Sequence, residues 1–421
     1  MIFYHPNIKH TLDFAKHSSH IEGNVDLING KDINRNCWFG CLAFIAADGS
    51  TNYAYEQTKK KYDIIFTPHK EEKYMMFYEA GDMHDDWFVY FYDIVPDDVK
   101  KDIEEKRCLL IVSMMNEGIN MPSTFPTMHE FIDRVGASKD TFMFISADFN
   151  IENKYKKFCE ENPNIEPVDV IKSQYFVTAM TNEYEQMSRV PHDYVNRSMG
   201  SFSQVNMDIR DYYYVCMNRL PKIHRQVIIA YLLKLGIFDK GLISMGSEQG
   251  GSAGTSQPWP KTFDFITDKD LLSDVMEWST KLEPLRPISI EGDLNIDDID
   301  SGENEGANPC GYTYSDQYRK VYFQVVTEDV FEAESMFFSQ TTYKPLVQLT
   351  PIVMFGSPNM MRCLHEVQNF LPYEFINYDY DLVVDNNERL LMVVDEIKRL
   401  CKMPIEQLHK NYYDELETIL K

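Results

Sequence analysis

Residues 321–370 constrain the fold of this chain most, because two strand-length apolar runs alternate there with helix signals. Val321–Val326 is β-branched and aromatic, as a buried strand is, and Pro351–Phe355 is a second such run. The turn 356–359 (Gly-Ser-Pro-Asn) then offers capping groups and a proline for a helix from about Met360 to Phe370. A strand–turn–helix unit of this kind predicts a parallel sheet, with helix N–H groups suited to bind an anion.

The first half of the chain repeats this pattern. Cys108–Ser113 is apolar throughout, which favours a parallel strand covered on both faces. Phe142–Ser146 and Trp87–Val95 are further expected strands, and amphipathic helices are expected at Thr127–Val135 and Asn153–Asn162. This alternation predicts an α/β class and a doubly wound sheet.

The length of 421 residues exceeds what one core supports and predicts two domains of about 200 residues each, here 1–205 and 206–421. A net charge of −25 disfavours extensive non-specific binding to nucleic acid, although a local basic groove remains compatible with this charge. No apolar run approaches the roughly 20 residues that span a bilayer. We therefore expect no membrane span and a cytoplasmic protein.

The eight cysteines are scattered, and only Cys37 and Cys41 stand close together. No further Cys or His set lies near them at zinc-ligand spacing, so we expect no metal site. Cys108, Cys216 and Cys363 lie in apolar surroundings and are expected to be buried free thiols.

Basic residues gather where an expected strand, Asp211–Met217, gives way to a helix. The segment 218–225 reads NRLPKIHR and holds Arg219, Lys222, His224 and Arg225. Cations in a first helical turn oppose the helix dipole, and a bound anion would relieve that conflict. Arginine suits phosphate because its planar fork of donors is permanently charged. Ion pairing with the chain's many carboxylates is the alternative interpretation.

A second set of polar residues lies in the stretch 321–370. Glu328 follows a strand, and Lys344 precedes Pro345 at what we expect to be a helix start. The carboxylate could accept hydrogen bonds from sugar hydroxyls, and the lysine could neutralise a diphosphate leaving group. A simple Glu328–Lys344 salt bridge explains the pair equally well.

A third set follows the strands of the first half. Glu117 and Asp148 each come just after a strand, where a carboxylate facing a cleft could act as general base. Such residues are also common as helix caps and as loop residues, which is the alternative. His69, His84 and His129 are weaker candidates for the base. The sequence holds neither a Walker A loop nor a dinucleotide-binding glycine fingerprint.

Three segments resemble a known family. NRLPKIHR at 218–225 resembles the N-R-x-P-[RK]-x-H-R motif of phage and other viral glycosyltransferase-like proteins. SQTTYKP at 339–345 is similar to their T-E-K-T-[FWY]-K-P motif, which is also reminiscent of fucosyltransferases and exostosin-like enzymes. PIVMFGSPNMMRCLHEV at 351–367 is similar to the strand–turn–helix that follows. Two segments upstream are also similar: IVSMMNEG at 111–118 to a strand that ends in a Glu-Gly pair, and FISADFN at 144–150 to a strand that ends in D-x-N. The likeness extends from about residue 108 to 400 and is strongest after residue 211.

The resemblance implies an α/β fold with two Rossmann-like lobes (GT-B-like) and an interdomain cleft. Residues 1–205 would form the acceptor side and 206–421 the nucleotide-sugar side, with the last helices packing back on the first lobe. The implied activity is metal-independent transfer of a sugar from a nucleotide sugar to a hydroxyl. The donor is a substrate, so no cofactor is expected, and the acceptor is a hydroxymethylated base of viral DNA or a glycan.

The resemblance also assigns roles to residues. The implied catalytic residues are Glu117, Arg225 and Lys344, and the acceptor side holds Asp148 and Asn150. The implied donor-binding residues are Asn218, Arg219, His224, Glu328, Thr342, Tyr343, Gly356 and Ser357. The Glu-Lys pair of the second motif is replaced here by Gln340-Thr341. A non-catalytic descendant that binds a nucleotide or glycan is therefore the alternative function.

Overall fold

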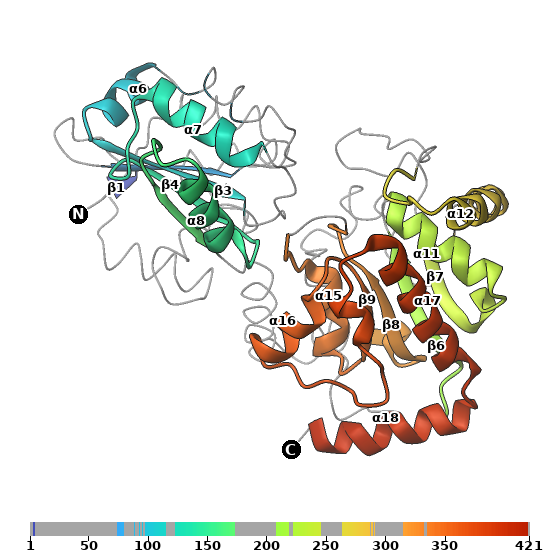
Figure 1. The fold of residues 1–421 in the computed structure, drawn as a ribbon. Coiled ribbons are helices and arrows are strands. Elements are labelled where there is room, and N and C mark those ends of the chain that lie inside the picture. The colour runs from blue at the N-terminus through green and yellow to red at the C-terminus, as the bar shows by residue number, and fades with distance from the viewer. Residues whose placement is uncertain are drawn as a thin grey trace, which may run out of the picture. The chain divides into compact units, whose positions relative to one another are not determined.

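A computed structural model describes residues 3–4, 74–79, 88, 92, 95, 97–114, 123–172, 208–218, 222–245, 263–286, 288, 290, 315–331 and 335–419. The chain divides into two compact units, Met1–Glu183 and Tyr184–Lys421. Each unit contains a parallel sheet with helices packed on it (Figure 1), so the predicted α/β class is confirmed.

The first unit holds a sheet of β1 (Phe3–Tyr4), β2 (Tyr74–Glu79), β3 (Cys108–Met114), β4 (Phe142–Ser146) and β5 (Asp169–Lys172). All neighbouring strands are parallel and lie in chain order. Its described helices are α6 (Asp97–Glu104), α7 (Thr124–Val135) and α8 (Ile151–Glu161).

These three helices share one apolar cluster with alternate strand residues, including Leu110, Val112, Phe142 and Phe144. They therefore cover the same face of the sheet. Right-handed crossovers that all advance in one direction have this result. The expectation of a doubly wound first sheet is wrong for the described strands, because nothing in the local pattern encodes the order in which strands pair.

The expected strand Trp87–Val95 is also wrong, since Phe88 and Tyr92 are helical. Phe88 is buried and packs against Phe131 and Phe144. A short apolar run fits a buried helix as well as a strand, so periodicity does not separate the two. β3 pairs instead with β2, a strand that the apolar pattern did not reveal.

The second unit holds β6 (Tyr212–Asn218), β7 (Gly241–Met245), β8 (Val321–Thr327) and β9 (Ile352–Phe355). They form a parallel sheet in the order β7-β6-β8-β9. The strands predicted from the two apolar runs of 321–370 are confirmed as β8 and β9. The direction of winding reverses between β6 and β8.

This reversal separates two crossover helices. The chain passes from β6 to β7 through α11 (Ile223–Lys234) and from β8 to β9, in the opposite direction, through α15 (Gln340–Val347). Right-handed crossovers then place α11 and α15 on opposite faces of the sheet. The carboxyl ends of β6 and β8 consequently form a topological switch point, where open α/β sheets bind ligands.

The remaining helices complete the second unit. α12 (Lys269–Leu282) packs on α11, and α17 (Asn386–Lys402) packs on α11 and β9. α18 (Ile405–Ile419) packs on β8, and the short α14 (Ser315–Tyr318) and α16 (Met360–Glu366) flank β8 and β9. The one-turn helices η2 (Phe238–Lys240), η3 (Glu283–Leu285) and η4 (Asp379–Leu382) lie in connections. These contacts tie the last two helices to the second unit.

A buried arginine anchors α18. The Arg210 guanidinium lies 4.3 Å from the centre of the Tyr412 ring and donates to the carbonyl of Tyr318 at 3.2 Å. Its backbone N–H donates to the hydroxyl of Tyr322 on β8 at 2.9 Å. The C-terminal helix is therefore held to the sheet by cation–π contact and hydrogen bonds.

Gly241→Ala is expected to destabilise the second unit by about 1–3 kcal/mol through overpacking. A Cβ at Gly241 would lie 2.3 Å from Cε2 of Tyr214, whose hydroxyl is fixed to the carbonyl of Ile237 at 3.0 Å. Gly236→Ala is the matched control. No heavy atom of a surrounding residue lies within 4 Å of a Cβ added there, so only the φ of +65° destabilises this variant, by about 1 kcal/mol. Urea unfolding measures both, and an equal or smaller loss for Gly241→Ala would contradict the packing.

Candidate functional site at the carboxyl ends of β6 and β8

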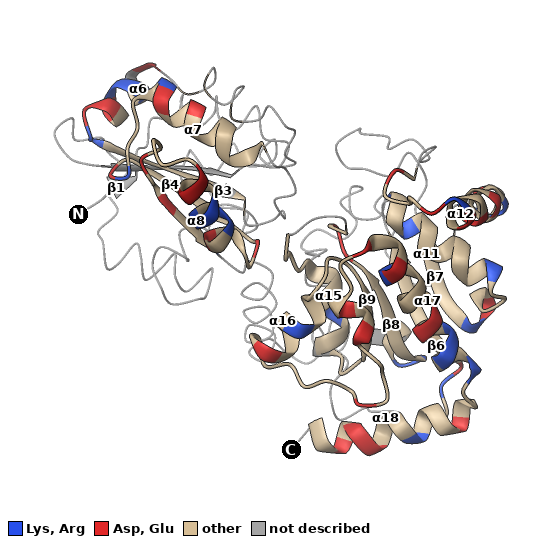
Figure 2. Ribbon diagram, in the orientation of Figure 1, with Lys and Arg blue, Asp and Glu red and all other residues tan. Residues whose placement is uncertain are grey.

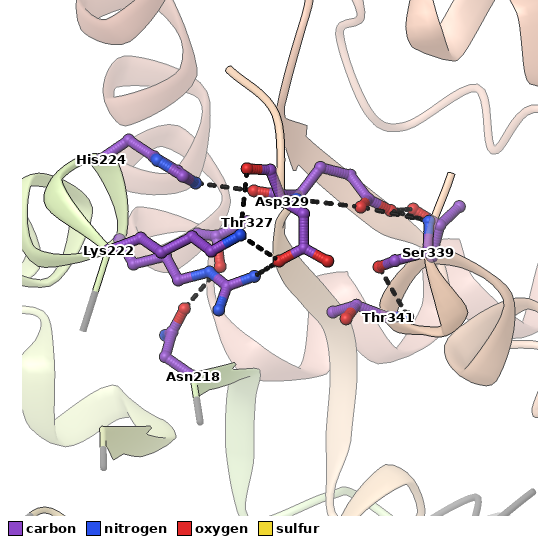
Figure 3. Close-up of polar contacts among 10 residues, drawn as sticks. Asn218, Lys222, His224, Thr327, Asp329, Ser339 and Thr341 are labelled. Carbon is purple, nitrogen blue, oxygen red and sulfur yellow. Dashed lines mark hydrogen bonds and ion pairs between the residues drawn. The ribbon is translucent and has the colours of Figure 1, made fainter. Parts of the chain in front are cut away.

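Two cations and a carboxylate meet at the switch point (Figure 3). Lys222 is the N-cap residue of α11, and its Nζ donates to Oδ1 of Asp329 at 2.9 Å. Arg225, in the first turn of α11, donates from Nη2 to the same oxygen at 2.5 Å. Asp329 follows β8, so neighbouring strand ends supply the two signs of charge. The ion pairing that was the alternative interpretation of the basic cluster is present.

This cluster differs from the surface ion pairs of the chain. Figure 2 shows basic and acidic residues intermixed along helices such as α12 and α18, where Lys281–Glu277 and Lys410–Asp414 pair across one helical turn. Exposed pairs of that kind contribute little to stability. The Arg225 side chain is only 8% exposed, and those of Lys222 and Asp329 are 28% and 27% exposed. The switch-point cluster is thus a partly desolvated charge site.

The Asp329 carboxylate stays ionised. Burial acts to raise the pKa of Asp329, but the neighbouring charges of Lys222 and Arg225 lower it below its ordinary value. Its hydrogen bonds within the described chain go to Oδ1 alone. Oδ2 therefore retains lone pairs beside two fixed cations.

Glu328 anchors the start of α15. Its fully buried carboxylate accepts from the backbone N–H of Ser339 at 3.1 and 3.2 Å, from that of Asp329 at 3.2 Å, and from the hydroxyl of Thr342. The Ser339 hydroxyl in turn caps α15 by accepting from the N–H of Thr341 at 3.2 Å. Burial and then the charge of Asp329 raise the pKa of Glu328. Both Glu328 oxygens are consequently engaged by the protein itself.

His224 is neutral and connects α11 to the segment that follows β8. Burial and then the charge of Arg225 lower the pKa of His224 to about 3. Its Nε2 donates to the carbonyl of Glu328 at 2.6 Å, and its ring stacks on Phe331 with centroids 5.7 Å apart. Asn218 likewise joins β6 to β8, since its side-chain oxygen accepts from the hydroxyl of Thr327. Both residues fix the strand ends around the cationic pair.

The turn 356–359 precedes α16, and a carboxylate of the protein itself binds the first N–H groups of this helix. Oδ1 and Oδ2 of Asp381 accept from the backbone N–H groups of Met361 and Arg362, each at 2.9 Å. A Cβ at Gly356 would lie 3.3 Å from Cβ of Glu328, so this glycine permits the two strand ends to approach. Ser357 is buried at the end of β9. The expected anion at this helix end is thus replaced by Asp381.

The expectation that Lys344 begins a helix is wrong. α15 begins at Gln340, so Lys344 lies in its last turn and Pro345 lies inside the helix. The helix dipole therefore favours the lysine instead of opposing it. Lys344 is buried, but it lies about 200° around the helix from Thr342, which contacts Glu328. The hydroxyl of Tyr343 donates to Oε1 of Gln368 at 2.9 Å.

In the first unit, Asp148 holds the start of α8. Its Oδ1 accepts from the N–H of Asn150 at 2.8 Å, and its Oδ2 accepts from Nζ of Lys154 at 2.7 Å. Asp148 is thus a structural loop residue, which is one of the alternatives, and Asn150 is the N-cap residue of α8. His129 is buried, with Nε2 at 3.0 Å from the hydroxyl of Tyr155.

Glu117 and Arg219 lie outside the described residues, as do His69 and His84. Their proposed roles therefore still depend on the sequence. Cys108, Cys216 and Cys363 are buried and form no disulfide among the described residues, as predicted.

Sequence reasoning missed Asp329, Asp381 and Arg389. Asp329 directly follows Glu328, so its place after a strand was the available signal. The Arg389 guanidinium donates to the carbonyls of Phe331, Gly356, Val383 and Val384 and to Oδ1 of Asn386. It joins three loops at the carboxyl edge of the sheet, and an arginine in an amphipathic helix gives no sequence signal of that role.

Within the described ranges, no group of three His, Cys, Asp or Glu side chains is arranged to hold a metal ion. No helix in the same ranges is long and apolar enough to cross a membrane. Comparison with protein-family models, with curated proteins and with solved structures finds no match to this chain.

Proposed function

We propose that the second unit binds the diphosphate of a nucleotide sugar at the carboxyl ends of β6 and β8. The protein then transfers the sugar to a hydroxyl acceptor, in a two-lobed GT-B-like arrangement. The observation that carries this proposal is the convergence of Lys222 and the buried Arg225 at the topological switch point.

The chemistry of the cationic pair suits a diphosphate. Arginine donates in a planar fork that fits phosphate oxygens, and lysine adds a mobile point charge. In glycosyl transfer the bond from the sugar carbon to the diphosphate oxygen breaks, so negative charge grows on the departing group. Fixed cations beside that oxygen stabilise the transition state more than the ground state.

The rest of the step is assigned by the resemblance. The acceptor oxygen forms the new bond to the sugar carbon and gives up its proton, with Glu117 as the proposed base. Arg219 would share the diphosphate, while Thr342 and Lys344 would line the donor pocket. Asp148 is assigned no proton transfer, because it is committed to Lys154 and to the start of α8.

Arg225→Gln is expected to weaken binding of a nucleoside diphosphate by about tenfold or more, since a hydrogen bond to a charged group is lost. Arg362→Gln is the matched control, because it removes the same charge from an exposed pair with Glu366. Calorimetric titration at constant ionic strength measures both. Equal affinities of the two variants would remove Arg225 from the site.

The transfer itself is tested with wild-type protein and a panel of nucleotide sugars. Acceptors are hydroxymethylated duplex DNA, at several salt concentrations, and glycans. Release of nucleoside diphosphate coupled to acceptor modification is the expected result. Failure of the wild-type protein to bind any nucleotide would refute the site.

A second candidate function is binding without transfer. The observation that favours binding without transfer is Gln340-Thr341 at the first two positions of α15. The T-E-K-T-[FWY]-K-P motif, which this segment resembles, has a Glu-Lys pair there. Nucleotide binding with no turnover on any donor would establish this alternative.

A further inference from the structure

The cationic pair already holds an anion supplied by the chain. Nζ of Lys222 and Nη2 of Arg225 both donate to a single oxygen, Oδ1 of Asp329. The proposed function would place a ligand phosphate oxygen at this point. A ligand must therefore exchange with Asp329 to reach both cations.

Asp329 is the carboxylate of this edge best suited to exchange. Glu328 and Asp381 fix helix starts, each with both oxygens engaged, and both are buried. Among the described residues, the Asp329 side chain is bound through one oxygen only, and it is 27% exposed. It can rotate into water without breaking a helix cap.

We propose that Asp329 determines the specificity of this site by competing with the ligand for Lys222 and Arg225. The site then accepts a diphosphate and rejects anions with a single charge. This inference rests on the proposed function and names the ligand class of the same site.

The selectivity follows from the exchange. A monoanion such as acetate would regain only the contacts that Asp329 already makes, and it would also lose entropy on association. Asp329 is tethered beside the cations and so has the advantage of an intramolecular partner. A diphosphate brings more charge and more oxygens, so its attraction to two cations exceeds that of one carboxylate.

Protonation does not open the site near neutral pH. The groups that face the Asp329 carboxylate are Lys222 and Arg225 of α11, with His224 and Glu328 close by. The two cations hold the pKa of Asp329 below its ordinary value, and His224 is neutral. Exchange is consequently driven by the charge of the ligand.

The test measures calorimetric affinities for pyrophosphate, orthophosphate and acetate at constant ionic strength. Wild-type protein is expected to bind pyrophosphate about tenfold or more tightly than orthophosphate, because of the additional charge. Asp329→Asn is expected to bind orthophosphate about tenfold more tightly than wild type, since the competing charge is gone. Asp274→Asn is the matched control, because it unpairs Lys234 in the last turn of α11 and should leave all affinities unchanged.

The outcomes separate the two proposals. If neither wild type nor Asp329→Asn binds any of these anions, the proposed function fails as well. If both bind with the same ratio of affinities, the site stands and the role of Asp329 is wrong. Weaker orthophosphate binding by Asp329→Asn would make Asp329 a ligand contact and overturn the competition. Equal affinities of the wild-type protein for pyrophosphate and orthophosphate would also overturn the competition. This comparison needs no variant, so it can be made even if Asp329→Asn does not fold.

Discussion

Arg389→Met is expected to cost about 4 kcal/mol of stability, because two buried carbonyls, those of Phe331 and Gly356, lose their donor together with two partly buried ones. Arg389 is 1% exposed, and its guanidinium donates to the carbonyls of Phe331, Gly356, Val383 and Val384. Burial lowers the pKa of Arg389 to about 10, so the group is still charged at neutral pH. Methionine retains much of the length of the side chain but supplies no donor.

Hydrogen exchange read by mass spectrometry measures this change within the second unit. We expect faster exchange in α17, in β9 and in the loop after β8, where the three joined segments lie. Arg399→Met is the control on the same helix, since its side chain is 45% exposed, Glu396 lies one turn away, and its one loop contact, with the carbonyl of Phe375, is exposed. Comparable protection in the two variants would contradict a joining role for Arg389.

Glu328→Ala is expected to cost about 3 kcal/mol, because the N–H groups of Ser339 and Asp329 and the hydroxyl of Thr342 lose their acceptor. Urea unfolding followed by exchange in α15 measures the loss. Glu366→Ala is the control, since that glutamate pairs with Arg362 on the surface. A loss no larger than that of the control would show that α15 does not depend on Glu328.

The cost of Glu328→Ala should also depend on pH. Burial raises the pKa of Glu328 in the folded protein above the value of 4.5 expected in the unfolded chain. Between those two values the folded state holds a proton that the unfolded state has lost, so rising pH lowers the free energy of unfolding. The variant lacks this dependence. The cost of the substitution is therefore expected to be greatest at and below pH 4.5 and to fall as the pH rises through the folded pKa.

The sequence predicted the central strands well. β4, β8 and β9 were recognisable because strands buried on both faces need continuous apolar runs. Strand order was not predictable in the same way, since it depends on contacts between distant segments. The one-directional first sheet and the reversal at β6 and β8 emerged only from pairing.

The site was predictable only where a local sequence pattern marks its residues. Basic residues in a first helical turn mark Lys222 and Arg225 as candidates from the sequence alone. Their partner Asp329 lies 104 residues from Arg225, and no local pattern joins the two. Lys344 was expected at a helix start on the assumption that Pro345 opens the helix, whereas the capping hydroxyl of Ser339 sets the start five residues earlier.

The strand order of the second sheet also determines when the cluster of Lys222, Arg225 and Asp329 can form during folding. β6 and β8 pair directly although more than a hundred residues separate Tyr212 from Val321. Such non-local parallel pairing is slow, because the chain loses entropy on closing the loop before any stabilising contact forms. On a growing chain, the cations of α11 emerge well before the strand end that carries Asp329. The ion pairs of Lys222 and Arg225 with Asp329 can therefore form only after β8 has joined the sheet, and they mark how far assembly has advanced.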